Sequence, residues 1–236
     1  MSRVIEIIFF DAGETILHPH PSFPELFADI VNRRGYSIAT QDIAEVQERL
    51  APHLVDLAEE TGIEHGPSLS PTASRTFWTY LYRRFLAEVG VEDESLADEL
   101  YAIFSSTSSY RLFDDVLPAL AELEAAGYRL GLISNFEGWL EKILVELEVG
   151  HLFDVSVISG VEGVEKPDPR IYEIALQRAG VLAENAMHVG DSPKLDVEPA
   201  SSVGISVVLL DRAGRYPEVS PRITSLEDLP PLMPTL

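Results

Sequence analysis

The sequence contains no cysteine, only three lysines and no long apolar run, and each absence narrows the range of functions. Without cysteine the chain has no disulfide framework, no thiolate metal site and no cysteine nucleophile. No apolar run approaches the roughly 20 residues of a membrane helix, and residues 1–10 lack the features of a signal peptide. We therefore expect a cytoplasmic protein that does not act on membranes.

The charge balance argues against a further class of partner. The 236-residue chain has a net charge of −22 at pH 7. Nucleic acids and anionic membranes are bound through clusters of lysine and arginine, which this composition disfavours. A small anionic substrate would need a local cation, so the positions of the few lysines are informative.

The most distinctive segment of the chain is at residues 4–15, which read VIEIIFFDAGET. An almost continuous apolar run ends there at Asp11. This pattern is typical of a strand that is buried on both faces and carries a carboxylate at its C-terminal end.

The next part of the chain has helical periodicity. Prolines at residues 16–24 predict an irregular linker. Apolar residues within 19–109 then recur at the spacing of helix faces, with a helix end or kink at Pro52 and a loop at residues 61–71.

From residue 112 onward, helices and strands alternate. Asp114 or Asp115 is expected to cap a helix that runs to Ala126 and stops at Gly127. Strands are expected at residues 128–133, 155–158, 186–189 and 205–210, with helices between them at 139–147, 169–179 and 195–202. The proline-rich tail beyond them is expected to be mostly irregular.

Together these patterns predict an α/β protein. Alternating strands and helices form βαβ units, which give a Rossmann-like parallel sheet with helices on both faces. We expect this core to comprise residues 1–18 and 110–236, and an all-helical domain, residues 19–109, to be inserted after the first strand.

Polar residues that immediately follow the predicted strands are candidates for a site, because ligands of open α/β sheets bind outside the carboxyl ends of the strands. Asp11, Ser134 with Asn135, and Asp191 each follow an apolar run, and Lys166 lies in the loop after the third strand. Taken singly, each of them suits an ordinary turn or helix cap. Their common placement at strand ends favours a shared site.

Four segments carry a family resemblance: DAGET at 11–15, LISN at 132–135, KPDPRIY at 166–172 and GDSPKLD at 190–196. In this order they resemble the four motifs of the haloacid dehalogenase-like hydrolase superfamily. The helical insertion after the first motif resembles the helical cap of that superfamily. The resemblance covers essentially the whole chain and is specific for the superfamily, but not for a substrate.

The resemblance implies a role for each matching residue. Asp11 would be the nucleophile that forms a covalent aspartyl intermediate. Ser134, Asn135 and Lys166 would bind the transferred anionic group, with Lys166 offsetting negative charge.

The resemblance also implies a Mg²⁺ site. Its ligands would be the carboxylates of Asp11 and Asp191 and the main-chain carbonyl of Gly13, a type of oxygen ligand set that suits Mg²⁺. Thr15 and Asp196 match supporting positions of the motifs, and Asp196 would stabilise the metal or Lys166.

Three positions depart from the family pattern. Phosphatases of the superfamily carry a second aspartate at the position of Gly13, which protonates the leaving group; general acid catalysis of this kind contributes about 10²–10⁴-fold. Glu14, His18 and His20 are nearby candidates to replace it, although we expect all three to be surface or hinge residues. Glu14 and Pro199 also stand where glycine is usual.

Three functions are compatible with these residues. The first is a Mg²⁺-dependent phosphatase of a small phosphorylated metabolite, weakened by Gly13. The second is a metal-independent 2-haloacid dehalogenase, which Ser134, Asn135 and Tyr172 resemble. The third is a catalytically impaired protein that binds a ligand or a partner. A phosphonatase would need a lysine in residues 19–109, where there is none, and the sequence leaves the substrate and the oligomeric state open.

Overall fold

The computed structural model describes residues 5–63 and 66–233. Val4 of the predicted first strand, residues 64–65 of the predicted loop and the last three residues of the tail lie outside this part. The chain divides into two compact units, one formed by Met1–Leu17 with Leu112–Leu236 and the other by His18–Arg111.

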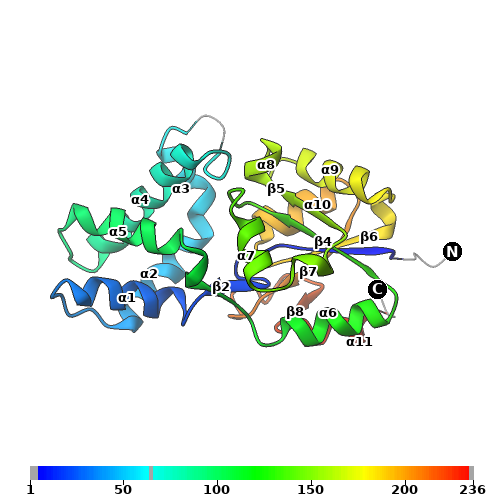
Figure 1. The fold of residues 1–236 in the computed structure, drawn as a ribbon, viewed down its shortest axis with the longest axis horizontal. Coiled ribbons are helices and arrows are strands. Elements are labelled where there is room, and N and C mark those ends of the chain that lie inside the picture. Colours follow the sequence, from blue (N-terminus) through cyan, green and yellow to red (C-terminus); the bar gives the residue numbers. More distant parts are fainter. Residues whose placement is uncertain (1–4, 64–65, 234–236) are drawn as a thin grey trace. The chain divides into compact units, whose positions relative to one another are not determined.

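The first unit is built on a six-stranded parallel sheet with strand order β5-β4-β1-β6-β7-β8 (Figure 1). The strands are β1 (Ile7–Phe10), β4 (Arg129–Ser134), β5 (Val155–Ile158), β6 (Ala186–Gly190), β7 (Ser206–Leu210) and β8 (Arg222–Ile223). All four residues of β1 are fully buried, because the strand lies between β4 and β6 and both faces of the sheet are covered. The predicted Rossmann-like fold is confirmed.

Helices cover both faces of this sheet. The helices are α6 (Val116–Ala125), α7 (Leu140–Glu146), α8 (Ser159–Glu162), α9 (Arg170–Ala179), α10 (Glu198–Ser202) and α11 (Leu229–Leu232). Figure 1 shows α9 and α10 on one face and α6 and α11 on the other. Buried side chains of α9, among them Ile171, Tyr172 and Ala175, share one apolar cluster with Ile7 and Phe9 of β1.

The second unit is helical and has its own core. It contains α1 (Phe23–Arg33), α2 (Thr40–Leu50), α3 (Leu54–Glu60), α4 (Pro71–Glu88) and α5 (Glu94–Phe104). Buried residues of these helices, including Phe27, Ile43, Phe85 and Leu100, form one cluster. The predicted helical insertion after the first strand is therefore confirmed, and α2 ends before Pro52 as expected. Among the described helices, none combines the length and the apolar character needed to cross a membrane.

The prediction of an irregular linker was wrong, whereas the tail is mostly irregular, as expected, and contains three short elements. The linker contains β2 (Leu17–Pro19), which pairs with β3 (Tyr110–Leu112). The tail contains β8, a 3₁₀ turn at Leu226–Asp228 and α11. The two short strands and β8 have only two or three residues each, too few to show an alternating pattern, so their pairing depends on partners far away in the sequence.

Of the two predicted cap residues, Asp114 and Asp115, the structure has Asp115 at the expected position but without the expected bond. Asp115 is at the N-cap position of α6, but its carboxylate makes no capping bond. Both of its oxygens instead accept from the guanidinium of Arg212, at 2.7 and 2.9 Å, and one also accepts from the Leu226 amide at 2.9 Å. Arg212 in turn donates to the main-chain carbonyl of Thr15 at 2.8 Å. Asp115 thus joins the start of α6 to the segment after β7 and to the turn at Leu226. Arg212 links these segments to the loop after β1.

Candidate active site

The carboxyl ends of the central strands place several polar residues at one edge of the sheet. Asp11 follows β1 directly, Ser134 is the last residue of β4, and Asp191 follows β6. Because β4, β1 and β6 are adjacent and parallel, these three residues lie along the same edge, where open α/β sheets bind their ligands. Asp11 and Ser134 are both buried.

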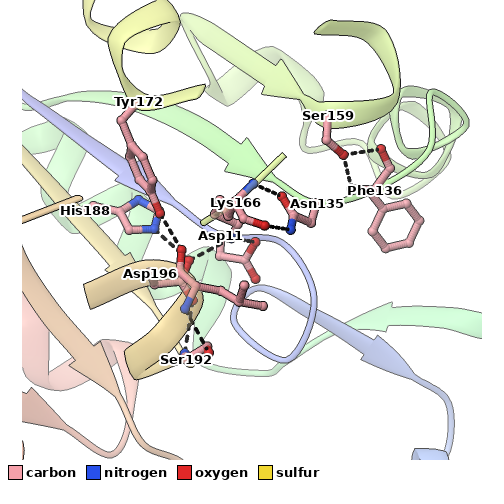
Figure 2. Close-up of polar contacts among 10 residues, drawn as sticks. Asp11, Asn135, Phe136, Ser159, Lys166, Tyr172, His188, Ser192 and Asp196 are labelled. Atoms are coloured by element: carbon pink, nitrogen blue, oxygen red, sulfur yellow. Dashed lines mark hydrogen bonds and ion pairs between the residues drawn. The ribbon is translucent and has the colours of Figure 1, made fainter. Parts of the chain in front are cut away.

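Lys166 is the cation at this edge. Its side chain is buried, and its Nζ donates to Asp11 Oδ1 at 2.6 Å and to Asp196 Oδ1 at 2.7 Å (Figure 2). Burial by itself lowers the pKa of Lys166, but the charges of Asp11 and Asp196 outweigh it and raise the pKa above its usual value. Lys166 is therefore a permanent positive charge at neutral pH, fixed beside Asp11.

Asn135 fixes the main chain of Lys166. The Asn135 Nδ2 group donates to the Lys166 carbonyl at 2.7 Å, and the Asn135 Oδ1 atom accepts from the Lys166 amide at 2.7 Å. Figure 2 shows both bonds between the two residues. The carboxamide of Asn135 thus holds the lysine loop against the end of β4, whereas substrate binding by Asn135 stays a prediction.

Asp196 is the second carboxylate that holds Lys166. It is buried, and besides Lys166 it contacts His188 Nε2 at 2.9 Å and accepts from the Ser192 amide at 3.0 Å. Burial raises the pKa of Asp196, but Lys166 and the hydrogen bond with His188 lower it well below its usual range. Asp196 therefore stays ionised at neutral pH.

His188 is a residue of the site that the sequence reasoning missed. It lies in β6 and is buried, and its Nε2 atom is 2.9 Å from Asp196 Oδ1. The ring of Tyr172 packs edge-on against the His188 ring, with 5.2 Å between the ring centroids. The hydroxyl of Tyr172 donates to the Leu195 carbonyl at 2.7 Å, so this tyrosine packs α9 against the site. The only signal for His188 in the sequence is a lone polar residue within an apolar strand, AMHVG.

The carboxylates of Asp11, Asp191 and Asp196 form a cluster in which one oxygen atom of each lies within 4.8 Å of the others. The pKa of Asp191 is raised well above its usual value, first by burial and then by the negative charges of Asp196, Asp11 and Glu14. The positive charge of Lys166 opposes this rise. The pKa of Asp11 is raised as well, by burial and by Asp196 against the effect of Lys166. Lys166 is bonded to only two of the three carboxylates, Asp11 and Asp196. An oxygen-binding divalent cation such as Mg²⁺ fits this donor set.

The other predicted positions differ in their surroundings. A Cβ atom at Gly13 would meet no heavy atom within 4 Å, so the position of the absent second aspartate is open space. The Thr15 hydroxyl is buried and has no hydrogen-bond partner among the described residues. Pro199 lies in the first turn of α10, where proline is well tolerated. His18 and His20 belong to the helical unit.

The fold and this edge define a class of protein: a Rossmann-like α/β protein with a buried aspartate directly after its first, central strand. A family model described as haloacid dehalogenase-like hydrolase matches residues 5–204. The chain belongs to this family.

Two curated relatives are similar over most of their length. A haloacid dehalogenase-like hydrolase domain-containing protein 3 of Danio rerio is 32% identical over 213 residues, which is 82% of this chain and 88% of the relative. A glyceraldehyde 3-phosphate phosphatase of Methanopyrus kandleri is 30% identical over 223 residues, or 93% and 89% of the two chains. Among solved structures, the magnesium-bound HAD-hydrolase YfnB of Bacillus subtilis has the same fold, with a TM-score of 0.72, 17% identity and coverage of 98% of this chain and 99% of that one.

The packing around Asp196 leads to a first mutational prediction. A Cβ atom at Gly190 would lie 2.2 Å from Asp196 Cγ and 2.5 Å from Asp196 Oδ2. Since Lys166, His188 and Ser192 hold that carboxylate, it cannot move away without breaking these bonds. We expect Gly190→Ala to lower the free energy of unfolding by about 1–3 kcal/mol, as overpacked cores do, and to disturb Lys166 as well.

Urea unfolding followed by circular dichroism measures this effect. Gly138→Ala is a suitable control, because a Cβ atom there would meet only Val161 Cγ2 at an ordinary 3.5 Å. Equal stability of the two variants would mean that the Asp196 carboxylate is less firmly held than its contacts indicate.

Proposed function

We propose that the protein is a Mg²⁺-dependent phosphatase that hydrolyses a small phosphorylated metabolite through an aspartyl-phosphate intermediate. The observation that carries the proposal is the arrangement around Asp11: Lys166 Nζ lies 2.6 Å from one of its oxygens, and Asp191 and Asp196 offer oxygens within 4.8 Å. The phosphatase name of the Methanopyrus kandleri relative supports this choice of reaction.

In the proposed reaction, an Asp11 oxygen attacks the phosphorus atom and the bond from phosphorus to the leaving oxygen breaks. Lys166 offsets the negative charge that gathers on Asp11 and on the phosphoryl oxygens. A water molecule then attacks the phosphorus of the aspartyl phosphate, which releases phosphate and restores the Asp11 carboxylate. Asp11, Asp191 and the Gly13 carbonyl would hold Mg²⁺, which polarises the phosphoryl group when bound.

The open space at Gly13 affects the choice of substrate. No carboxyl group is available at that position to protonate the leaving oxygen, and a general acid is worth about 10²–10⁴-fold. The leaving group must then depart as an anion or take its proton from water. We therefore expect faster turnover of aryl and acyl phosphates, whose leaving groups are weak bases, than of alkyl phosphates.

A substrate panel tests the proposal. Aryl, acyl and alkyl phosphates are assayed for phosphate release, and 2-haloacids for halide release, each with Mg²⁺ and with a chelator. Phosphate release that requires Mg²⁺ and decreases as the leaving group becomes more basic is the expected result. Halide release that persists in the chelator would favour the second candidate, a dehalogenase, for which Gly13 is no handicap because halide needs no proton. Stabilisation by ligands without turnover of any compound would favour a binding protein.

A further inference from the structure

Glu14 has a backbone conformation that is unusual for its residue type. Its φ is +56°, in the left-handed region, which costs a residue with a Cβ atom about 1–2 kcal/mol. Glycine would avoid this cost, yet the chain carries a glutamate one residue after Gly13. Backbone strain of this kind is concentrated at functional sites, so the Glu14 side chain invites a functional explanation.

Glu14 lines a small cavity of about 30 Å³ in the core unit, at the side of the site that faces β7. Asp191 lines the same cavity, together with Asp211, Arg212, Arg215 and Tyr216 from the segment after β7. The cavity therefore adjoins the carboxylate cluster directly, through Asp191.

Two of the charged side chains around this cavity are engaged in structural bonds. Asp211 accepts from the main-chain amides of Arg215 and Tyr216, at 2.8 and 2.9 Å, and from the Arg222 guanidinium at 3.0 Å. Arg212 binds Asp115 and the Thr15 carbonyl, as described above. Glu14, Asp191 and Arg215 are the charged groups of the lining that these bonds leave available.

Glu14 interacts electrostatically with Arg215 and with Asp191. Glu14 is exposed, yet desolvation by the surrounding loops raises the pKa of its carboxyl group, and the charges of Arg215 and then Arg212 oppose that rise. Glu14 in turn adds its negative charge to those that act on Asp191. The charge of Glu14 thus acts on Asp191, and the opposite charge of Arg215 lies on the same small cavity as both residues.

We propose that Glu14 and Arg215 set the affinity of the carboxylate cluster for Mg²⁺ with opposite signs, Glu14 strengthening binding and Arg215 weakening it. This inference rests on the proposed function, because it assumes that the cluster of Asp11, Asp191 and Asp196 binds the cation. Glu14 attracts a divalent cation toward Asp191 from the cavity side, and Arg215 repels it. Together the two residues would keep the Mg²⁺ affinity of the cluster high enough for the ion to bind and low enough for it to exchange.

Isothermal titration calorimetry with Mg²⁺ tests the proposal on the purified full chain, without any substrate. Removing one charge near a doubly charged ion changes its dissociation constant by roughly three- to tenfold at partly solvated distances. We expect Glu14→Gln to weaken Mg²⁺ binding by this factor, Arg215→Gln to tighten it by a similar factor, and the double variant to return close to the wild type. All differences should shrink from 0.05 to 0.5 M salt, because exposed charges are screened.

Three control variants make the outcome specific. Glu184→Gln and Lys142→Gln remove exposed charges of the same unit, Glu184 at the opposite end of β6 and Lys142 in α7, and should leave the affinity unchanged. Asp191→Asn should abolish binding. If the wild type binds no Mg²⁺, or Asp191→Asn binds equally well, both the metal site of the proposed function and this inference are wrong. If those two results are as expected but Glu14→Gln and Arg215→Gln match the wild type or shift it in the same direction, this inference alone is wrong.

A glycine variant separates the charge from the backbone. Glu14→Gly removes the carboxylate and also relieves the left-handed conformation, so it should raise Tm by about 2–4 °C in a chain of this size. Its Mg²⁺ affinity should nevertheless fall as much as that of Glu14→Gln. A more stable variant with unchanged affinity would show that Glu14 affects only the loop.

Discussion

Replacing Lys166 with methionine is expected to cost about 3–5 kcal/mol of unfolding free energy, because it leaves buried charges without a partner. In the wild type Lys166 is 3% exposed, and its ammonium group is bonded to Asp11 and Asp196. Methionine fills much of the same volume, so the lower unfolding free energy reflects the missing charge and not an empty cavity. Phosphate release should fall to background in the same variant, since no side-chain cation then offsets the negative charge on Asp11 and the phosphoryl oxygens.

The stability that Lys166→Met loses should be larger at neutral pH than at acidic pH. Lys166 and His188 hold the pKa of Asp196 below its usual value, so Asp196 contributes stability above about pH 4, the range in which the unfolded carboxyl group is ionised. That contribution is lost as the pH falls through the folded pKa. Without Lys166 the pKa of Asp196 rises, so the variant should be weakest at neutral pH; its deficit should narrow toward about pH 4 and close only at still lower pH, where the wild type also loses the contribution of Asp196.

Urea unfolding of both proteins at pH 7 and near pH 4 measures this difference. Lys142→Met is the matched control, because Lys142 is exposed and its pair with Glu146, at 3.5 Å, lies on the surface of α7. Surface pairs of this kind contribute about 0–1 kcal/mol. A Lys166→Met variant as stable as this control at pH 7 would contradict the role of the buried lysine.

The central sheet and the residues at its strand ends could be predicted because they depend on local sequence. Long buried strands such as β4 have a strong apolar signal, and Asp11 follows such a run directly. Gly180 ends α9 with φ +67°, as a glycine after a helical pattern predicts. Resemblance to four short motifs then related Lys166 to Asp11 across 155 positions, which no local pattern does.

The parts that could not be predicted depend on long-range partners. Asp115 has the sequence context of a helix cap, yet Arg212, 97 residues later, forms a paired bond with its carboxylate. A bidentate bond between arginine and a carboxylate is stronger than a single capping bond to a main-chain amide. His188 was missed for the same reason, because its partner Asp196 is defined only by the turn after β6. The positive φ of Glu14 likewise reflects the geometry of the loop after β1 and not a preference of glutamate.

Replacing Asp11 with asparagine should lower turnover of the best phosphorylated substrate at least about 10³-fold, which corresponds to about 4 kcal/mol of transition-state stabilisation. The amide keeps the shape of the side chain but is too weak a nucleophile to attack phosphorus. Folding should not suffer, because Lys166 retains Asp196 as a partner at 2.7 Å. The pKa of Asp11 is also raised in the folded protein, so its negative charge opposes folding at neutral pH and its removal does not.

Two measurements distinguish loss of the nucleophile from a general defect. Rapid acid quenching with a substrate labelled on its phosphoryl group should trap label on the wild-type protein, and hydroxylamine should release it; Asp11→Asn should trap none. Asp154→Asn is the control, since Asp154 lies at the surface and pairs with Arg129 at 2.9 Å. Turnover of Asp11→Asn within tenfold of the wild type would exclude Asp11 as the nucleophile. The trapped group also separates the two reactions that Asp11 can perform, because a phosphatase leaves a phosphoryl label on the protein whereas a dehalogenase leaves an ester of the haloacid carbon chain.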